Sequence, residues 1–217
     1  LFQLGVQAHT RDDNAFAAKC FEECAALRRR IGDEAGSVKA LWIMATNPAV
    51  SMPDAARVRL ALAACEFVVV SDCVRRTDTT RYAHVLLPAL AWGEKDGTVT
   101  NSERRISRNR AFLPAAGGAK PDWWIVTEVA RRMGFAREFP YATAADVFRE
   151  HAALSGFENG GSRDLDISGL SALSDAGYDE LAPVQWPVPA SGAPRPRFFA
   201  DTPFFTASGK AQLVALN

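Results

Sequence analysis

Several common signatures of functional sites are missing from this 217-residue sequence. It has no Gly-x-Gly-x-x-Gly fingerprint, no P-loop and no Gly-x-Ser-x-Gly elbow, so neither a nicotinamide-type fold nor a serine hydrolase is supported. Its formal net charge is zero, so no overall field attracts nucleic acid or an anionic membrane. No apolar run approaches the roughly 20 residues of a membrane span, and no signal peptide is visible. We expect no nucleic acid and no membrane as partners, and a cytoplasmic location.

Cysteine and histidine are also scarce, and their spacing does not fit a metal site. No C-x-x-C pair occurs among the four cysteines, which are Cys20, Cys24, Cys65 and Cys73. The three histidines are scattered at His9, His84 and His151. Hydrophobic residues make up 48% of the chain, enough to fold without disulfides, so we expect reduced thiols and no metal ligands.

Alternating apolar runs and amphipathic segments organise the first part of the chain. Asn14–Arg30 has a helical apolar stripe, and Asp54–Ala64 is a second helical segment. Val38–Thr46 and Phe67–Val70 are apolar runs of the kind found in strands covered on both faces. Strand, helix and strand within about 33 residues match a βαβ unit. A third apolar run, His84–Leu87, predicts a further strand.

Helical signals return later in the sequence. Asp122–Met133 predicts a helix that ends at Gly134, with its inward side formed by Ile125, Val126, Val129 and Met133. Thr143 and Asp146 have capping-box spacing and predict a helix through about Leu154. Residues 155–196 are rich in Gly, Ser, Asp and Pro, which predicts a long ordered connection.

Polar residues follow the two strands of the predicted βαβ unit. Asn47 comes after the first strand, and Ser71 and Asp72 end the second. Ligands of open parallel sheets bind beyond the carboxyl ends of the strands. An acidic residue there can accept hydrogen bonds from ribose hydroxyls or from guanine, and Asn47 can both donate and accept. These residues are equally common as turn and strand-end residues, so both interpretations stay open.

A dense mixed-charge segment, Gly93–Ser107, follows the third strand. We expect a turn at Gly97-Thr98 within it. Lys95 supplies a cation that could neutralise a pyrophosphate. Alternatively, Lys95 is a surface lysine that forms an ion pair with Glu94 or Asp96. Such a pair contributes under about 1 kcal/mol to stability.

Asp122 stands at the start of a predicted helix, after Pro121. An acidic residue there is suited to be the N-cap. It could also contact a ligand that reaches the helix N-terminus, and the two interpretations remain open.

Four sequence landmarks occur in one order: LWIMATNPAVSMPD at Leu41–Asp54, VVVSD at Val68–Asp72, VLLPALAWGEKDGTVTNSERRIS at Val85–Ser107 and AKPDWWI at Ala119–Ile125. With them the chain resembles the molybdopterin oxidoreductase family, whose members bind a bis-molybdopterin guanine dinucleotide cofactor with molybdenum. The resemblance implies cofactor contacts by Asn47, Ser71, Asp72, Lys95 and Asp122. It implies no catalytic residue and no metal ligand in this chain.

Later segments discriminate within the family. Phe148–Leu170, Tyr178–Val188 and Phe204–Val214 resemble assimilatory nitrate reductase catalytic subunits. Formate dehydrogenase alpha subunits are the alternative. A second alternative is a non-catalytic scaffold of the kind found in the large iron–sulfur subunit of NADH dehydrogenase. The resemblance to nitrate reductases implies reduction of nitrate to nitrite and an electron-donor protein or domain as partner.

The resemblance also implies an architecture. The expected fold class is α/β, a three-layer doubly wound cofactor-binding domain with a mainly parallel sheet over residues 1–155. Residues 156–217 are expected to form an extended, irregular connection to a C-terminal β-barrel domain outside this chain. A [4Fe–4S] cluster is expected in a missing N-terminal part, so the remaining domains of the enzyme are partners and the isolated segment should be inactive. His84 departs from the family, whose members usually have Asp before the V-L-L-P run.

Overall fold

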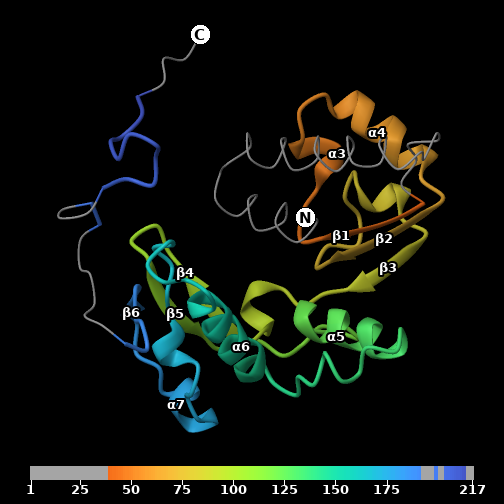
Figure 1. Cartoon of the computed structure of the whole chain (residues 1–217). Coiled ribbons are helices and arrows are strands. Elements are labelled where there is room, and N and C mark those ends of the chain that lie inside the picture. Colours follow the sequence, from red (N-terminus) through yellow and green to blue (C-terminus); the bar gives the residue numbers. More distant parts are fainter. Residues whose placement is uncertain (1–38, 192–197, 200–202, 214–217) are drawn as a thin grey trace. The chain divides into compact units, whose positions relative to one another are not determined.

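The computed structural model describes residues 39–191, 198–199 and 203–213 (Figure 1). The chain divides into two compact units, Leu1–Leu87 and Pro88–Asn217. The predicted helix Asn14–Arg30 and the cysteines within it lie outside the described residues.

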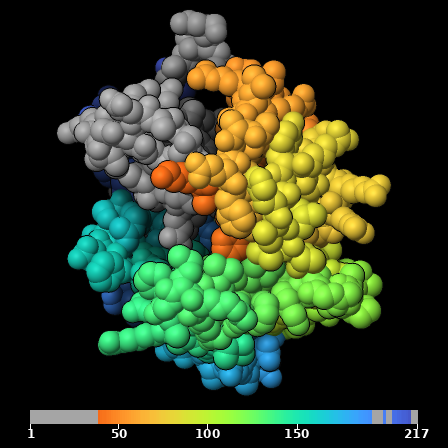
Figure 2. Space-filling model, turned by 90° about the vertical axis from the view of Figure 1, so that its right-hand side faces the viewer, coloured from red at the N-terminus to blue at the C-terminus, as the bar shows by residue number. Residues whose placement is uncertain are grey.

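The first unit is built on a three-stranded sheet in the order β1-β2-β3. Strand β1 (Ala40–Met44) pairs in parallel with β2 (Phe67–Asp72), as the two apolar runs predicted. The third strand, β3 (Val85–Pro88), agrees with the predicted run to one residue at each end. The segment that follows β2 reaches the surface, where it is drawn in yellow in Figure 2.

Two helices, α3 (Pro48–Ser51) and α4 (Ala55–Ala64), connect β1 to β2. The side chain of Asp54 caps α4 by accepting from the backbone N–H of Arg57 at 3.3 Å. The core between helices and sheet consists of the buried residues Ile43, Ala49, Leu62, Cys65, Val68 and Val70. This core holds the carboxyl ends of β1 and β2 side by side, because Met44 pairs with Ser71 in the ladder.

The second unit contains an antiparallel sheet in the order β4-β5-β6. Strands β4 (Gly97–Thr100) and β5 (Arg105–Asn109) form a hairpin, and the two-residue β6 (Val184–Gln185) pairs with β5. The turn predicted at Gly97-Thr98 is wrong, since both residues lie in β4. The chain turns after Thr100 instead, where Asn101 Oδ1 accepts from the backbone N–H groups of Glu103 and Arg105, each at 3.0 Å.

Helices α5 (Asp122–Arg132), α6 (Ala144–Gly156) and α7 (Asp175–Asp179) belong to this unit. The described residues also contain three short 3-10 helices, η1 (Thr80–Tyr82), η2 (Trp92–Glu94) and η3 (Ser168–Leu170). Helix α5 ends as predicted, with Gly134 at a positive φ of 97°. The prediction that Met133 faces inward is wrong, because its side chain is 68% exposed. The buried positions of α5 are Ile125, Thr127 and Ala130.

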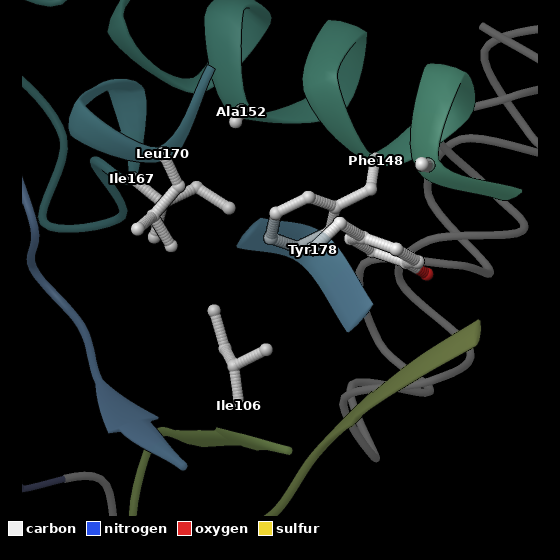
Figure 3. Packing of buried hydrophobic residues seen from close by; sticks show 7 residues of the cluster. Ile106, Phe148, Ala152, Ile167, Leu170 and Tyr178 are labelled. Carbon is white, nitrogen blue, oxygen red and sulfur yellow. The ribbon is translucent and has the colours of Figure 1, made fainter. Parts of the chain in front are cut away.

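The core of the second unit brings α6 against the hairpin and the later segment (Figure 3). Its buried members are Ile106, Ala145, Phe148, Ala152, Ile167, Leu170 and Tyr178. The rings of Phe148 and Tyr178 lie 5.3 Å apart. Residues after 156 therefore supply three of the seven buried side chains, although their composition predicted only a connection.

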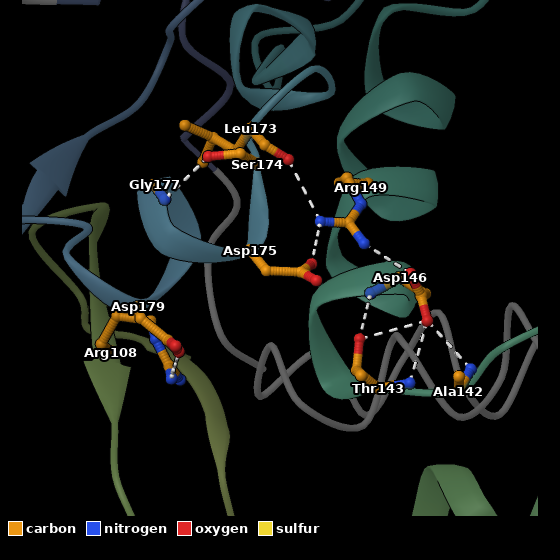
Figure 4. Close-up of polar contacts among 10 residues, drawn as sticks. All are labelled: Arg108, Ala142, Thr143, Asp146, Arg149, Leu173, Ser174, Asp175, Gly177 and Asp179. Atoms are coloured by element: carbon orange, nitrogen blue, oxygen red, sulfur yellow. Dashed lines mark hydrogen bonds and ion pairs between the residues drawn. The ribbon is translucent and has the colours of Figure 1, made fainter.

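The capping box predicted for α6 is present (Figure 4). Asp146 accepts from the backbone N–H groups of Ala142 and Thr143, each at 2.9 Å, and from the Thr143 hydroxyl. Arg149, one turn later, donates to Asp146 and, at 2.9 Å, to Asp175 of α7. This network ties the start of α6 to α7.

The α/β class predicted from the sequence is confirmed by the parallel pair β1–β2 with its helical crossover. The division into domains at residue 155 stays a prediction. The two compact units are divided at another point of the chain, between Leu87 and Pro88.

Candidate functional site

Asn47 lies at the carboxyl end of β1, where it precedes α3. Its Oδ1 accepts from the hydroxyl of Thr79 at 2.6 Å and from the Thr79 backbone N–H at 3.1 Å. Thr79 is fully buried, and its hydroxyl oxygen also accepts from the backbone N–H of Ala49 at 3.1 Å. Thr79 therefore fixes the orientation of the Asn47 amide and leaves the NH₂ group as its donor side.

Thr79 was not among the residues that the sequence analysis selected. It is 32 positions from Asn47, and a threonine in a polar loop carries no signal of burial. The T-D-T run that contains it, Thr77–Thr79, follows the second landmark Val68–Asp72, and this nearness was the only available hint.

Ser71 and Asp72 end β2 and differ sharply in their surroundings. Ser71 is fully buried, and its Oγ accepts from the indole N–H of Trp42 at 2.8 Å. Asp72 is partly exposed, and its Oδ1 accepts from the backbone N–H of Val74 at 2.9 Å. Asp72 thus presents a carboxylate at the strand end, whereas the Ser71 side chain is engaged in packing β2 against β1.

Lys95 and Asp122 form an ion pair in the second unit, with Nζ and Oδ2 3.1 Å apart. The two side chains are 35% and 29% exposed. Asp122 is the first residue of α5, and Pro121 occupies the N-cap position that the sequence had offered to Asp122. An acidic side chain in the first turn interacts favourably with the positive end of the helix dipole.

The other carboxylate oxygen of Asp122 is the most informative atom of this pair. Oδ1 is buried and has no hydrogen-bond partner within the part of the chain that the structure describes. Buried carboxylate oxygens are nearly always paired, because an unmet acceptor costs about 1–3 kcal/mol. The position is therefore suited to receive a hydrogen-bond donor from a bound group.

Backbone contacts hold Lys95 in place. The side-chain NH₂ of Asn109, at the end of β5, donates to the carbonyl of Lys95 at 2.8 Å and to that of Trp92 at 3.3 Å. The carboxylate of Glu94 accepts from the backbone N–H of Ala91 at 2.8 Å. Lys95 is thus supported on both sides, and it pairs with neither Glu94 nor Asp96.

Asp96 forms its ion pair with Arg108 of β5, at 2.9 Å. The Arg108 side chain is only 2% exposed and also bonds Asp179 of α7 at 3.1 Å. Its guanidinium carbon lies 4.0 Å from the centre of the Tyr178 ring, which covers it. This buried charge could not be predicted from the sequence, because one of its partners, Asp179, is 71 positions away.

The structure thus brings together the predicted residues in two sets. Asn47, Ser71 and Asp72 gather at the ends of adjacent parallel strands in the first unit. Lys95 and Asp122 are in direct contact in the second. Within residues 39–191, 198–199 and 203–213, no cluster of three metal-binding side chains occurs. No helix in the same residues has the length and apolarity needed to cross a bilayer.

Comparison with curated proteins gives nitrate reductases with high identity. The chain is 59% identical over 158 residues to the nitrate reductase of Klebsiella oxytoca, covering 73% of this chain and 18% of that protein. It is 36% identical over 162 residues to the assimilatory nitrate reductase catalytic subunit of Bacillus subtilis, covering 73% and 21%. An F420-dependent formate dehydrogenase subunit alpha of Methanocaldococcus jannaschii is 43% identical over 119 residues, covering 54% and 18%. The chain therefore spans about a fifth of the length of these relatives.

A solved structure shares the fold. Acetylene hydratase from Pelobacter acetylenicus superposes with a TM-score of 0.56 at 21% identity, over 82% of this chain and 22% of that one. The sequence profile described as molybdopterin oxidoreductase matches residues 7–132, which is more than half of the 217 residues. The chain belongs to the molybdopterin oxidoreductase family.

Proposed function

We propose that this chain is the part of a molybdenum-dependent nitrate reductase that binds one guanine dinucleotide arm of a bis-molybdopterin guanine dinucleotide cofactor. The observation that carries the proposal is the 59% identity to a nitrate reductase, together with the buried, unpartnered oxygen of Asp122 beside Lys95. When bound, the molybdenum cofactor supplies two-electron oxygen-atom transfer, which reduces nitrate to nitrite.

The residues of the chain fit such a group by charge and hydrogen-bonding capacity. The Asp72 carboxylate, only one of whose oxygens is engaged within the described residues, can accept from a guanine edge or from ribose hydroxyls. Asn47, oriented by Thr79, offers N–H donors at the neighbouring strand end. The Lys95 ammonium is suited to a diphosphate. Ser71 is fully buried, so a ligand contact by its hydroxyl remains a prediction from the family resemblance.

In this proposal the chain positions a cofactor and contains no reacting side chain. The donor of electrons, a [4Fe–4S] cluster and the remaining domains of a cytoplasmic enzyme would lie outside these 217 residues. The isolated segment should therefore give no nitrite with a reduced viologen dye, whereas the whole enzyme should. Nitrite production by the isolated segment would contradict the assignment of the site.

Formate dehydrogenase is the second candidate, because 43% identity extends over 119 residues to one such subunit. Nitrate reductase is favoured because its match is longer and of higher identity. A non-catalytic scaffold would have no use for the joint presence of Asp72, Lys95 and Asp122. Assay of the whole enzyme with nitrate and with formate distinguishes the three.

The test of cofactor binding uses the full-length protein with Asp72→Ala. After acid release, its molybdenum and guanine nucleotide content should fall at least several-fold. Glu66→Ala is the matched control, since Glu66 is an exposed carboxylate that precedes the opposite end of β2. Unchanged guanine content in Asp72→Ala, with Glu66→Ala also unchanged, would remove Asp72 from the cofactor site.

A further inference from the structure

A cavity of about 340 Å³ lies in the segment that follows β2. It is formed entirely within the first unit and is lined by Arg75, Arg76, Thr77, Asp78, Thr80 and Arg81. Asp72, at the end of β2, lies three residues before the first of these arginines.

The three arginines of this cavity have no side-chain partner within the described residues. The ion pairs found there involve other arginines, among them Arg108, Arg131 and Arg149, and none reaches residues 75, 76 or 81. Each of these three guanidinium groups has up to five N–H donors in a planar fork that matches phosphate or carboxylate oxygens. Such a group without a protein partner is available to an anion.

Hydrogen bonds make the frame of the cavity rigid. The backbone N–H of Thr77 donates to Thr80 Oγ1 at 2.7 Å, and the backbone N–H of Thr80 donates to Thr77 Oγ1 at 3.1 Å. Thr79, between them, is fully buried and anchored to Asn47. The arginines on either side are therefore presented from a fixed turn rather than from a free loop.

Charge and size together define the class of ligand. Three arginines and Asp78 give the cavity a net charge of about +2, which matches the charge of about −1.5 to −2 of a phosphate monoester at neutral pH. The volume is larger than a bare phosphate needs and falls in the range of small organic ligands. We propose that the cavity lined by Arg75, Arg76 and Arg81 binds the phosphate group of a nucleotide.

Two sources could supply that phosphate. One is the guanine dinucleotide arm of the cofactor, and this source rests on the proposed function. The other is a free nucleotide that binds apart from the cofactor. An acidic protein surface is less consistent with the structure, because the arginines line a hollow rather than a flat patch.

The experiment uses the full-length enzyme and three single variants, Arg75→Gln, Arg76→Gln and Arg81→Gln. Arg137→Gln is the control, since Arg137 is exposed and has no partner within the described residues. Isothermal titration calorimetry with GMP, with inorganic phosphate and with poly-glutamate measures binding, and acid release measures guanine content. Circular dichroism at the temperature of assay verifies folding, and Arg→Lys variants test rescue by a conserved charge.

Two results support the proposal and identify the source. In the first, the wild-type protein binds GMP with a micromolar to millimolar Kd, and the Gln variants bind it at least fivefold more weakly while their guanine content is unchanged. This result indicates a free nucleotide. Guanine content that falls at least threefold in the Gln variants, without GMP binding by wild type, indicates the cofactor arm. In both cases Arg137→Gln should match wild type.

Two results overturn it. If folded Gln variants keep both GMP affinity and guanine content, no phosphate is bound by this cavity. If poly-glutamate alone binds and its affinity falls in the Gln variants, the arginines recognise an acidic polypeptide. Because Asp72→Ala tests guanine content separately, a failure here leaves the proposed function standing.

Discussion

Lys95 and Asp122 are 27 positions apart in the sequence, yet their side chains meet at 3.1 Å at the start of α5. The contact joins the third sequence landmark to the fourth. It leaves Lys95 about one-third exposed and one oxygen of Asp122 buried without a partner in the described residues. A pair of this exposure contributes under about 1 kcal/mol to folding, which is compatible with the role in cofactor binding that we propose for it.

Replacing Lys95 by Met in the full-length enzyme should therefore affect the cofactor more than the fold. We expect guanine nucleotide content to fall about tenfold, because a cation is lost beside the proposed diphosphate, while the melting temperature changes by only about 1–3 °C. Lys95→Arg should retain most of the content, and Lys39→Met, an exposed lysine in the first unit, should have no effect. Normal content in Lys95→Met would exclude Lys95 from the cofactor site.

Thr79 should be a positioning residue for Asn47. Thr79→Val keeps the shape but removes the hydroxyl that donates to Asn47 Oδ1 and accepts from Ala49 N–H. Burying unpaired groups at a fully buried position should cost about 1–3 kcal/mol in urea unfolding and also lower guanine content. Thr79→Ser should rescue both measurements. Rescue of stability without rescue of guanine content would mean that Asn47 does not contact the cofactor.

His84 stands where the family resemblance led us to expect Asp, and the structure shows how a histidine serves there. Its Nδ1 accepts from the backbone N–H of Val68 at 2.9 Å, and its ring stacks near Phe67 with centroids 6.1 Å apart. An Asp carboxylate can accept the same bond, so His84→Asp should be close to wild type in urea unfolding. His84→Ala leaves the N–H of fully buried Val68 unpaired and should cost about 1–3 kcal/mol. Equal stability of the Asp and Ala variants would contradict this role.

Asp146 should make stability depend on acid pH. Hydrogen bonds from the backbone N–H of Ala142, from Arg149 and from Thr143 lower the pKa of Asp146 from its ordinary 3.8 to about 2. Because the folded pKa is depressed, the stabilisation is complete above pH 4 and is lost as pH falls toward 2. Asp146→Asn should therefore be less stable than wild type by about 1 kcal/mol at pH 7, with allowance for solvent screening.

The measurement is urea unfolding of both proteins at pH 7, 4 and 3, followed by fluorescence. The gap between Asp146→Asn and wild type should narrow as pH decreases. Asp164→Asn is the control, because Asp164 has no hydrogen-bond partner within the described residues. A gap that stays constant over this range would show that the charge of Asp146 does not stabilise α6.

Local sequence patterns predicted helices and strands well where one feature, such as a continuous apolar run or a capping box, was decisive. The continuous apolar runs at β1 and β2 predicted two strands, and Thr143 with Asp146 identified the start of α6. The turn predicted at Gly97 was wrong, because glycine is common in turns but does not by itself define one. Here Asn101 sets the turn by accepting hydrogen bonds from two backbone N–H groups. The prediction that Met133 is buried was wrong, because helical spacing does not show where the layer that packs against the helix ends.

The positions of the candidate site residues on the fold could be predicted from the sequence, but their contacts could not. Strand ends selected Asn47 and Asp72, since the sequence shows directly where an apolar run stops. The burial of Ser71 beneath Trp42 and the pairing of Lys95 with Asp122 depend on residues 29 and 27 positions away. Separations of that length are decided by packing, which periodicity does not describe.

Lys95 and Asp96 are neighbours in the chain, but their side chains are committed to different elements, Lys95 to α5 and Asp96 to Arg108 and thereby to α7. The peptide unit between them thus lies between two ion-pair networks that reach different helices. A substitution of Asp179 on α7 would remove one of the two carboxylates that bond Arg108, and would thereby change the contacts of the segment that follows Lys95.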